Sequence, residues 1–190
     1  LWMRQNGLEA AVKQLAATGT PILGICGGYQ MLGQSLSDPD GVEQGGVLMG
    51  MGLLPIRTVF APQKTRTRRS ATAAPPFDGA RLEGYEIHMG QTWTEGAAPF
   101  CYLDNGFPDG AVSGHVFGTY LHGLFDTGSL TDRLAAYLAD LRGLTLESGP
   151  VEDHTTFKER QYNLLADTVR THLDLTAIYR TMEEFSHDTD

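Results

Sequence analysis

The chain has 190 residues, of which 41% are hydrophobic and 19% charged, the composition of an ordinary globular domain. Fourteen basic residues against 23 acidic ones give a net charge of −9, which argues against nucleic acid as the main partner, because phosphate backbones attract basic surfaces. No apolar run of about 18 residues suggests a membrane span, and two cysteines, Cys26 and Cys101, are too few for a disulfide framework, so a cytoplasmic protein is expected.

The first 36 residues predict a helix, a strand and a second helix. Apolar residues recur at helical spacing over residues 8–16, and Gly19 follows as a stop signal. Residues 21–25 form a short apolar run between helix breakers, which is typical of a buried strand. Two glycines after Cys26 predict a sharp turn into the next helix. This order is typical of an α/β fold with a central mixed, mostly parallel sheet flanked by helices.

The rest of the chain predicts strands followed by two helices. Short β-prone runs predict strands at residues 53–60, 81–88, 111–116 and 117–121. Residues 63–76 carry several basic residues and a double proline, so we expect an exposed loop. Periodicity predicts helices at residues 129–143 and 156–173, followed by a frayed acidic tail at 183–190. Because no repeat or low-complexity linker interrupts the chain, we expect residues 1–190 to form one domain.

Cys26 occupies a position that would expose a nucleophile. It lies in Gly24-Ile-Cys-Gly-Gly-Tyr-Gln30, between the predicted strand and helix. A tight glycine turn there would present the side chain at the carboxyl end of the strand. The N-terminus of the following helix would point toward the sulfur, and the Gly27 N–H would be free to donate to an oxyanion. The alternative is a buried structural cysteine, but flanking glycines favour substrate access over packing.

Two histidines are candidates for the base that such a thiol requires. His122 follows the apolar residues 117–121 and precedes Gly123, so it would lie at a strand end near the sheet edge that carries Cys26. His88 ends another predicted strand and is the second candidate. The alternative for each is a histidine with a structural role in the core or in a loop. No group of ligand residues has zinc spacing, so no metal site is expected.

Several segments resemble known families, in the same order along the chain. Gly24-Ile-Cys-Gly-Gly-Tyr-Gln-Met-Leu-Gly33 is similar to the nucleophile segment of class I glutamine amidotransferases. Segments 52–58, 64–65, 84–92 and 118–125, with the tail from residue 157, are similar to the cobyric acid synthase family. The resemblance covers nearly the whole chain. It implies a flavodoxin-like amidotransferase fold that lacks its first strands.

The resemblance also implies a set of roles. Cys26 would be the nucleophile and His122 the catalytic histidine of a glutaminase. Gly28 and Gln30 would line the glutamine pocket, and Gly27 would donate to the oxyanion. Ammonia would pass to an N-terminal synthase domain that is absent from this chain. That domain, with ATP and magnesium, amidates carboxylates of a corrinoid in cobalamin (vitamin B12) biosynthesis; no cofactor is expected on this chain.

Two departures from the wider class change these expectations. The glutamate found two residues after the histidine in many amidotransferases is Leu124 here, and Asp126 has a different offset. We therefore expect a Cys-His dyad in which another group, such as a backbone carbonyl, fixes the tautomer of His122. The chain also begins after the loop that supplies a second oxyanion donor in the family. Since one lost donor costs about 100- to 1000-fold in rate, we expect this chain alone to hydrolyse glutamine weakly.

Other proteins are compatible with the same residues. The dyad would be shared by cobyrinic acid a,c-diamide synthase and by the glutaminase that amidates a cell-wall lipid intermediate. A γ-glutamyl cysteine hydrolase would need a complete oxyanion hole and no partner, and a binding protein would need no reactive thiol. The basic segment from Lys64 to Arg69 is interpreted as a solvated surface, with docking to the synthase domain or to corrinoid carboxylates as the alternative.

Overall fold

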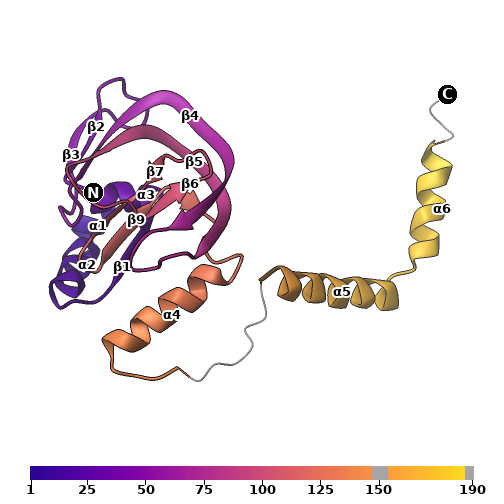
Figure 1. The fold of residues 1–190 in the computed structure, drawn as a ribbon. Helices are drawn as coiled ribbons and strands as arrows, with labels where there is room; N and C mark the ends of the chain where they lie inside the picture. The colour runs from indigo at the N-terminus through magenta and orange to yellow at the C-terminus, as the bar shows by residue number, and fades with distance from the viewer. Residues whose placement is uncertain (147–153, 187–190) are drawn as a thin grey trace. The chain divides into compact units, whose positions relative to one another are not determined.

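The structure, a computed structural model, describes residues 1–146 and 154–186. The chain divides into two compact units, Leu1–Gly149 and Pro150–Asp190 (Figure 1). The expectation of one domain over residues 1–190 stays a prediction.

A small sheet in the first unit carries the segment that contains Cys26. Two helices, α1 (Trp2–Gln5) and α2 (Leu8–Ala17), precede β1 (Ile22–Ile25), and α3 (Gly27–Leu32) follows it. The sheet order is β1-β9-β8, with β8 at Ala111–Ser113 and β9 at Val116–Thr119. β1 and β9 are parallel, so their carboxyl ends lie side by side. The predicted helix, strand and helix of the first 36 residues are therefore confirmed.

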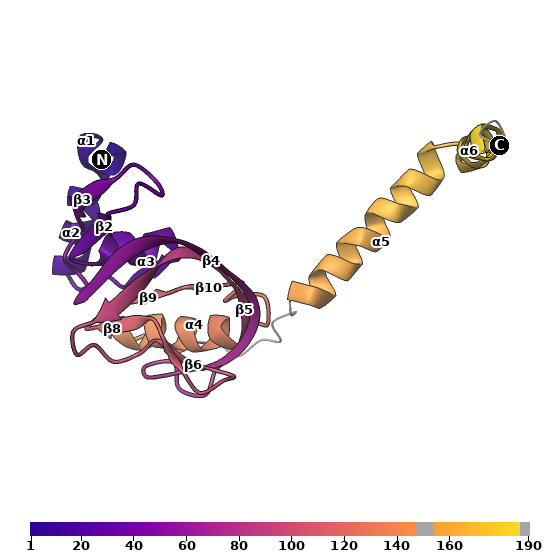
Figure 2. The same ribbon diagram turned by 90° about the horizontal axis from the view of Figure 1, so that it is seen from above.

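A larger sheet contains two unusually long strands. Its order is β10-β5-β4-β2-β3, and the bounds are Leu121–His122 for β10, Arg81–Thr94 for β5, Ile56–Ala73 for β4, Ser35–Asp38 for β2 and Gly46–Met49 for β3. β6 (Cys101–Leu103) pairs with β4, and β7 (Pro108–Asp109) pairs with β6. β4 and β5 curve together around α3 and the smaller sheet (Figure 2).

The loop predicted at residues 63–76 is wrong for most of its length. β4 continues through this basic segment to Ala73 and pairs in antiparallel register with β5, from Lys64 opposite Met89 to Thr72 opposite Arg81. Threonine and cationic residues alternate here with a period of two, which suits a strand with one exposed face despite the basic content and the nearby double proline. A register irregularity between Val59 and Lys64 separates this part from the start of β4.

The α/β class is confirmed, but the sheets are less parallel than expected. Among the named strand pairings of the described residues, only β1–β9 and β2–β4 are parallel, and the other six are antiparallel. Short connections join several successive strands, and a short connection permits only antiparallel neighbours. The helix predicted at residues 129–143 is present as α4 (Ser129–Leu141).

Two clusters of buried residues form the core of the first unit. One includes Phe77, Phe100 and Phe117, with partly buried residues of α4 packed against it. The other includes Tyr29 and Leu32 of α3 and Ile56 of β4.

Two glycines allow α3 to pack directly on the smaller sheet. A Cβ at Gly24 would lie 2.5 Å from Cδ1 of Leu32, and a Cβ at Gly118, its partner on β9, would overlap the ring of Tyr29. Gly24 therefore serves packing, contrary to the expectation that the glycines flanking Cys26 serve access alone.

The second unit contains two helices. α5 (His154–His172) confirms the helix predicted at residues 156–173, and α6 (Leu175–Ser186) follows it. The predicted frayed tail begins within α6, and residues 187–190 lie outside the described residues. None of the helices in the described ranges is long and apolar enough to cross a membrane.

Candidate active site

Cys26 lies on a strained turn between β1 and α3. Its backbone has φ 54° and ψ −115°, and it is the only non-glycine residue with positive φ in the part of the chain that the structure describes. Such conformations cost about 1–3 kcal/mol and gather at functional sites. The Cys26 N–H donates to the Thr119 carbonyl at 2.9 Å, and the Gln30 N–H donates to the Cys26 carbonyl at 3.1 Å. The turn is therefore held from both sides and has the predicted strand–turn–helix form.

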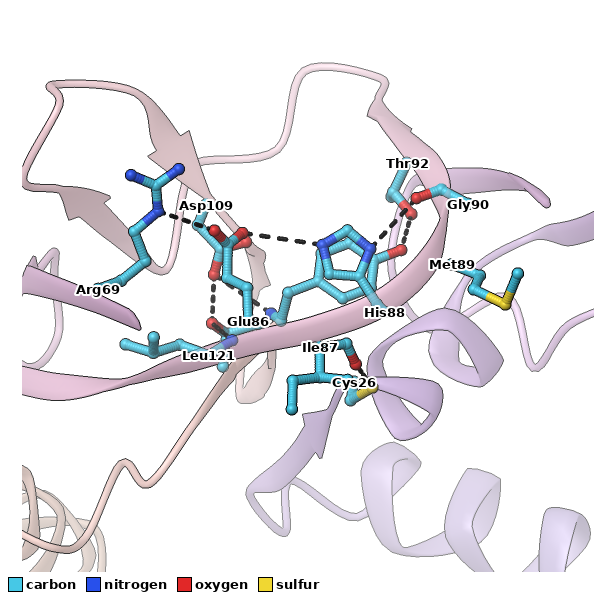
Figure 3. A network of polar contacts seen from close by, with 12 residues as sticks. Cys26, Arg69, Glu86, Ile87, His88, Met89, Gly90, Thr92, Asp109 and Leu121 are labelled. Carbon is cyan, nitrogen blue, oxygen red and sulfur yellow. Dashed lines mark hydrogen bonds and ion pairs between the residues drawn. The ribbon is translucent and has the colours of Figure 1, made fainter. Parts of the chain in front are cut away.

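The thiol of Cys26 points toward β5. Its Sγ donates a hydrogen bond to the carbonyl oxygen of Ile87 at 3.4 Å (Figure 3). Cys26 is half-buried, and a Cβ at Gly27 or at Gly28 would meet no other atom within 4 Å. The space next to these two glycines is therefore open, as the approach of a substrate carbonyl to backbone N–H donors requires.

His122 lies at the end of β10, which pairs with the part of β5 that contacts Cys26. Leu121 and His122 pair in antiparallel register with Glu86 and Tyr85. The imidazole stacks on the Tyr85 ring, with centroids 5.0 Å apart and planes 3° from parallel. Nε2 of His122 is buried and has no hydrogen-bond partner. A buried ring nitrogen without a protein partner is costly, so it calls for an explanation, of which a catalytic role is one.

Gly84 permits the close approach of β10 to β5. A Cβ at this position would overlap the carbonyl oxygen of His122. Only glycine therefore fits beside His122 at this point of the strand.

β5 brings the two predicted catalytic residues to neighbouring places. Tyr85, which stacks on His122, and Ile87, which accepts from Cys26, are two positions apart, a separation of about 6.7 Å along a strand. Positions two apart have side chains on the same face. Within the described ranges, no hydrogen bond joins the thiol to a ring nitrogen of His122.

Gln30 occupies a buried position in α3, with 6% of its surface exposed. Its Nε2 donates to the Met89 carbonyl and to the Tyr120 hydroxyl, both at 3.1 Å. Both amide hydrogens therefore have internal partners. The side chain fastens α3 to β5 two positions beyond Ile87.

His88 lies on the opposite face of β5 from Ile87, because side chains alternate along a strand (Figure 3). Its Nδ1 is 3.2 Å from the Gly90 carbonyl oxygen, and its ring stacks on Tyr120 with centroids 3.7 Å apart. Nε2 is 3.8 Å from Oε1 of Glu86. The structure therefore does not bring His88, the second candidate base, to the thiol.

A buried carboxylate anchors this opposite face. Glu86 is 8% exposed, and its Oε2 accepts from Nε of Arg69 at 2.9 Å (Figure 3). The imidazole of His88 and the guanidinium of Arg69 hold the pKa of Glu86 below its ordinary value. The carboxylate is therefore ionised at neutral pH and fixes β5 from behind the thiol.

Asp109 is the second buried carboxyl group near this face. It accepts from the Thr119 hydroxyl and from the Tyr120 N–H at 3.2 Å. Burial raises the pKa of Asp109. Glu86, His88 and Asp109 line part of a cavity of about 640 Å³. No group of three or more His, Cys, Asp or Glu residues that could hold a metal ion occurs among the described residues.

Four residues of β5 that locate the site were not predicted from the sequence. Gly84, Tyr85, Glu86 and Ile87 each contact or position a candidate residue, directly or through the backbone. The alternation in Gly84-Tyr-Glu-Ile-His88 was a usable signal for which side chains share a face. It could not show that the Ile87 carbonyl would face the thiol.

Solved structures of other proteins resemble this fold. The structure of PurLQS from Thermotoga maritima shares it with a TM-score of 0.51 and 14% identity, over 69% of this chain and 68% of that chain. A crystal structure of a glutamine amidotransferase matches at a TM-score of 0.47, with 18% identity, over 75% of this chain and 71% of that one.

The family follows from the sequence match. The model of the CobB/CobQ-like glutamine amidotransferase domain matches residues 1–130. This chain belongs to the CobB/CobQ-like glutamine amidotransferase family, as the resemblance of the sequence predicted.

The curated relatives are longer proteins. The cobyric acid synthase of Ruminiclostridium cellulolyticum is 46% identical over 197 residues, which cover 96% of this chain and 38% of the relative. The cobyric acid synthase of Lachnoclostridium phytofermentans is 41% identical over 203 residues, covering 96% of this chain and 40% of the relative. The chain therefore spans about two fifths of the length of these relatives.

Proposed function

We propose that this chain is the glutaminase part of a cobyric acid synthase, with Cys26 as the nucleophile and His122 as the base. The observation that carries the proposal is the placement of both residues against one short stretch of β5. A strained elbow presents the thiol there, and His122 has a buried ring nitrogen without a partner. Family membership and the named relatives supply the reaction class.

The reaction begins with transfer of the thiol proton to His122. In the structure the thiol donates to the Ile87 carbonyl, so a rotation of the Cys26 side chain must redirect the proton to Nε2. The thiolate attacks the side-chain amide carbon of glutamine, and a tetrahedral oxyanion forms. The imidazolium returns the proton to the leaving nitrogen, which departs as ammonia.

A glutamyl thioester on Cys26 remains after ammonia leaves. His122 then removes a proton from water, which attacks the thioester and releases glutamate with the thiol restored. We assign the Gly27 N–H, at the start of α3, to the oxyanion of both steps. Gly28 leaves room for the substrate, and Gln30 positions the pocket by holding α3 to β5.

The released ammonia is the substrate of a second domain. It reaches a synthase domain in which ATP, with magnesium, activates carboxylates of a corrinoid for amidation in cobalamin biosynthesis. ATP, magnesium and the corrinoid are assigned to that domain and not to this chain.

One substitution tests the proposal in the full protein. Cys26→Ala should abolish amidation driven by glutamine and leave amidation driven by free ammonium salts unchanged, because only ammonia production uses the thiol. Amidation of the corrinoid is followed by mass spectrometry. Loss of both activities in a folded variant, or retention of the glutamine-driven one, would contradict the role of Cys26.

A further inference from the structure

Three cationic side chains form a row on the exposed face of β4. Lys64, Arg66 and Arg68 are exposed and alternate with Thr65 and Thr67. Their side chains therefore share one face, each about 6.7 Å from the next along the strand. We call Lys64, Arg66 and Arg68 the cationic row.

The strand register places this row beside the proposed dyad. Arg68 lies opposite Tyr85 and Arg66 opposite Ile87 in the antiparallel pair. Directly opposite residues have their side chains on the same face of a sheet. This is the face on which His122 stacks on Tyr85. The row is therefore one strand spacing, about 4.8 Å, from the residues that contact Cys26 and His122.

The row differs from the other cations of β4 because its charges are not neutralised. Arg57 forms an ion pair with Glu95 at 2.8 Å, and Arg69 forms one with Glu86 at 2.9 Å. No ion pair or hydrogen bond engages the charged groups of the row within residues 1–146 and 154–186. Adjacent like charges repel, and an anion bound between them would offset that repulsion.

We propose that Arg66 and Arg68 bind the α-carboxylate of glutamine, and that Lys64 contributes charge to the same subsite. This inference depends on the proposed function, which places the amide carbon of glutamine at Cys26. The only anionic group of glutamine lies at the far end of the same short molecule, within reach of flexible guanidinium groups on the next strand. Two guanidinium groups provide the paired N–H donors that carboxylates prefer.

The negative net charge of the whole chain makes the cationic row important for binding a carboxylate. With a net charge of −9, the protein repels a free carboxylate at long range. A local row of cations on the proposed substrate face offsets this repulsion where glutamine must enter. It also selects an amino acid over a neutral amide that lacks the carboxylate.

The test measures labelling of Cys26 in the full protein by two reagents. The diazo ketone analogue of glutamine carries an α-carboxylate, and iodoacetamide does not. Arg66→Gln and Arg68→Gln should each raise the concentration of the analogue that gives half-maximal labelling by about tenfold. The labelling rate with iodoacetamide should not change. Arg57→Gln removes a charge from the same strand outside the row and should leave both reagents unaffected.

The outcomes separate this inference from the proposed function. If the analogue labels Cys26 equally well in the wild type and both row variants, the carboxylate subsite is wrong and the nucleophile assignment stands. If neither reagent labels Cys26 in the wild type, the nucleophile assignment fails, and the subsite fails with it. If the row variants weaken only the binding of the corrinoid acceptor, measured with saturating ammonium, the row serves the acceptor and the glutamine subsite is overturned.

Two conservative variants distinguish the loss of a carboxylate contact from misfolding. Arg66→Lys and Arg68→Lys retain the charge and should recover part of the lost affinity, since lysine binds a carboxylate with fewer fixed donors. Thermal unfolding should be the same for all row variants, because exposed substitutions usually change stability little. Loss of affinity without any recovery in the lysine variants, together with lowered unfolding temperatures, would assign the effect to structure and overturn the subsite.

Discussion

The Sγ atom of Cys26 lies 3.4 Å from the carbonyl oxygen of Ile87, and this contact ties the elbow to the middle of β5. Two positions earlier on the strand, Tyr85 stacks on His122. β5 is thus a common support for two residues that lie far apart in the sequence. Small changes in β5 should therefore alter the reaction even where they touch neither residue's reacting atoms.

The stacked pair of Tyr85 and His122 should control how well the base is oriented. Stacked rings are worth about 0.5–1.5 kcal/mol beyond burial, so Tyr85→Ala should lower kcat for glutamine hydrolysis about 3- to 10-fold. Tyr85→Phe keeps the ring and should retain nearly full activity. Tyr102→Ala is a matched control, because that tyrosine is similarly exposed, 51% against 46%, on a different strand. Equal losses in Tyr85→Ala and Tyr102→Ala would refute an orienting role.

Gly84 should be intolerant of any side chain. Because a Cβ at this position overlaps the His122 carbonyl oxygen, Gly84→Ala should displace β10 and the imidazole with it. A displacement of about 1 Å can cost about 100-fold in rate, which sets the expected loss of kcat. Glu83→Ala, at the preceding exposed position, provides the control and should change kcat little. Full activity in a folded Gly84→Ala protein would show that β10 tolerates the shift.

The strained backbone of Cys26 should be visible as a stability difference between two variants. Neither Cys26→Gly nor Cys26→Ala has a nucleophile, but only glycine adopts φ 54° and ψ −115° without strain. Glycine also has the larger conformational entropy in the unfolded chain, which lowers the stability of Cys26→Gly. When this loss is subtracted from the relief of backbone strain, Cys26→Gly should still be more stable than Cys26→Ala by about 1 kcal/mol. Urea unfolding measures the free energies. A Cys26→Ala protein as stable as Cys26→Gly would argue that the turn relaxes.

The two buried carboxyl groups should give opposite pH dependences of stability. The folded pKa of Glu86 is lowered, so its contribution is present above the ordinary value of about 4.3 and is lost as pH falls through the folded pKa. The destabilisation caused by Glu86→Gln should therefore be largest at neutral pH and shrink in acid.

The folded pKa of Asp109 is raised, so its stabilising protonated form is lost as pH rises from about 3.9 through the folded pKa. Asp109→Asn cannot ionise and should become more favourable relative to the wild type over that range. Unfolding free energies of both variants at several pH values provide the comparison. Parallel pH dependences for the two variants would show that the two carboxyl groups do not differ in this way.

Local sequence determined the elbow and the elements around it. Apolar residues between helix breakers predicted β1, and the glycines after Cys26 predicted the turn into α3, because strand burial and turn geometry depend on a few adjacent residues. The placement of His122 at a strand end was predicted for the same reason. The basic composition of residues 64–69 predicts a loop, but their alternation makes them part of β4.

Only the tertiary structure decided what surrounds the thiol. The register of β5 against β10 and β4 set which backbone carbonyl faces Cys26, which ring supports His122, and which cations share their face. It also directed His88 to the other face, toward Glu86 and away from the thiol. A shift of one residue would exchange these faces, since side chains alternate along a strand. Register between strands distant in sequence depends on the packing of the whole unit, which the local residue pattern does not contain.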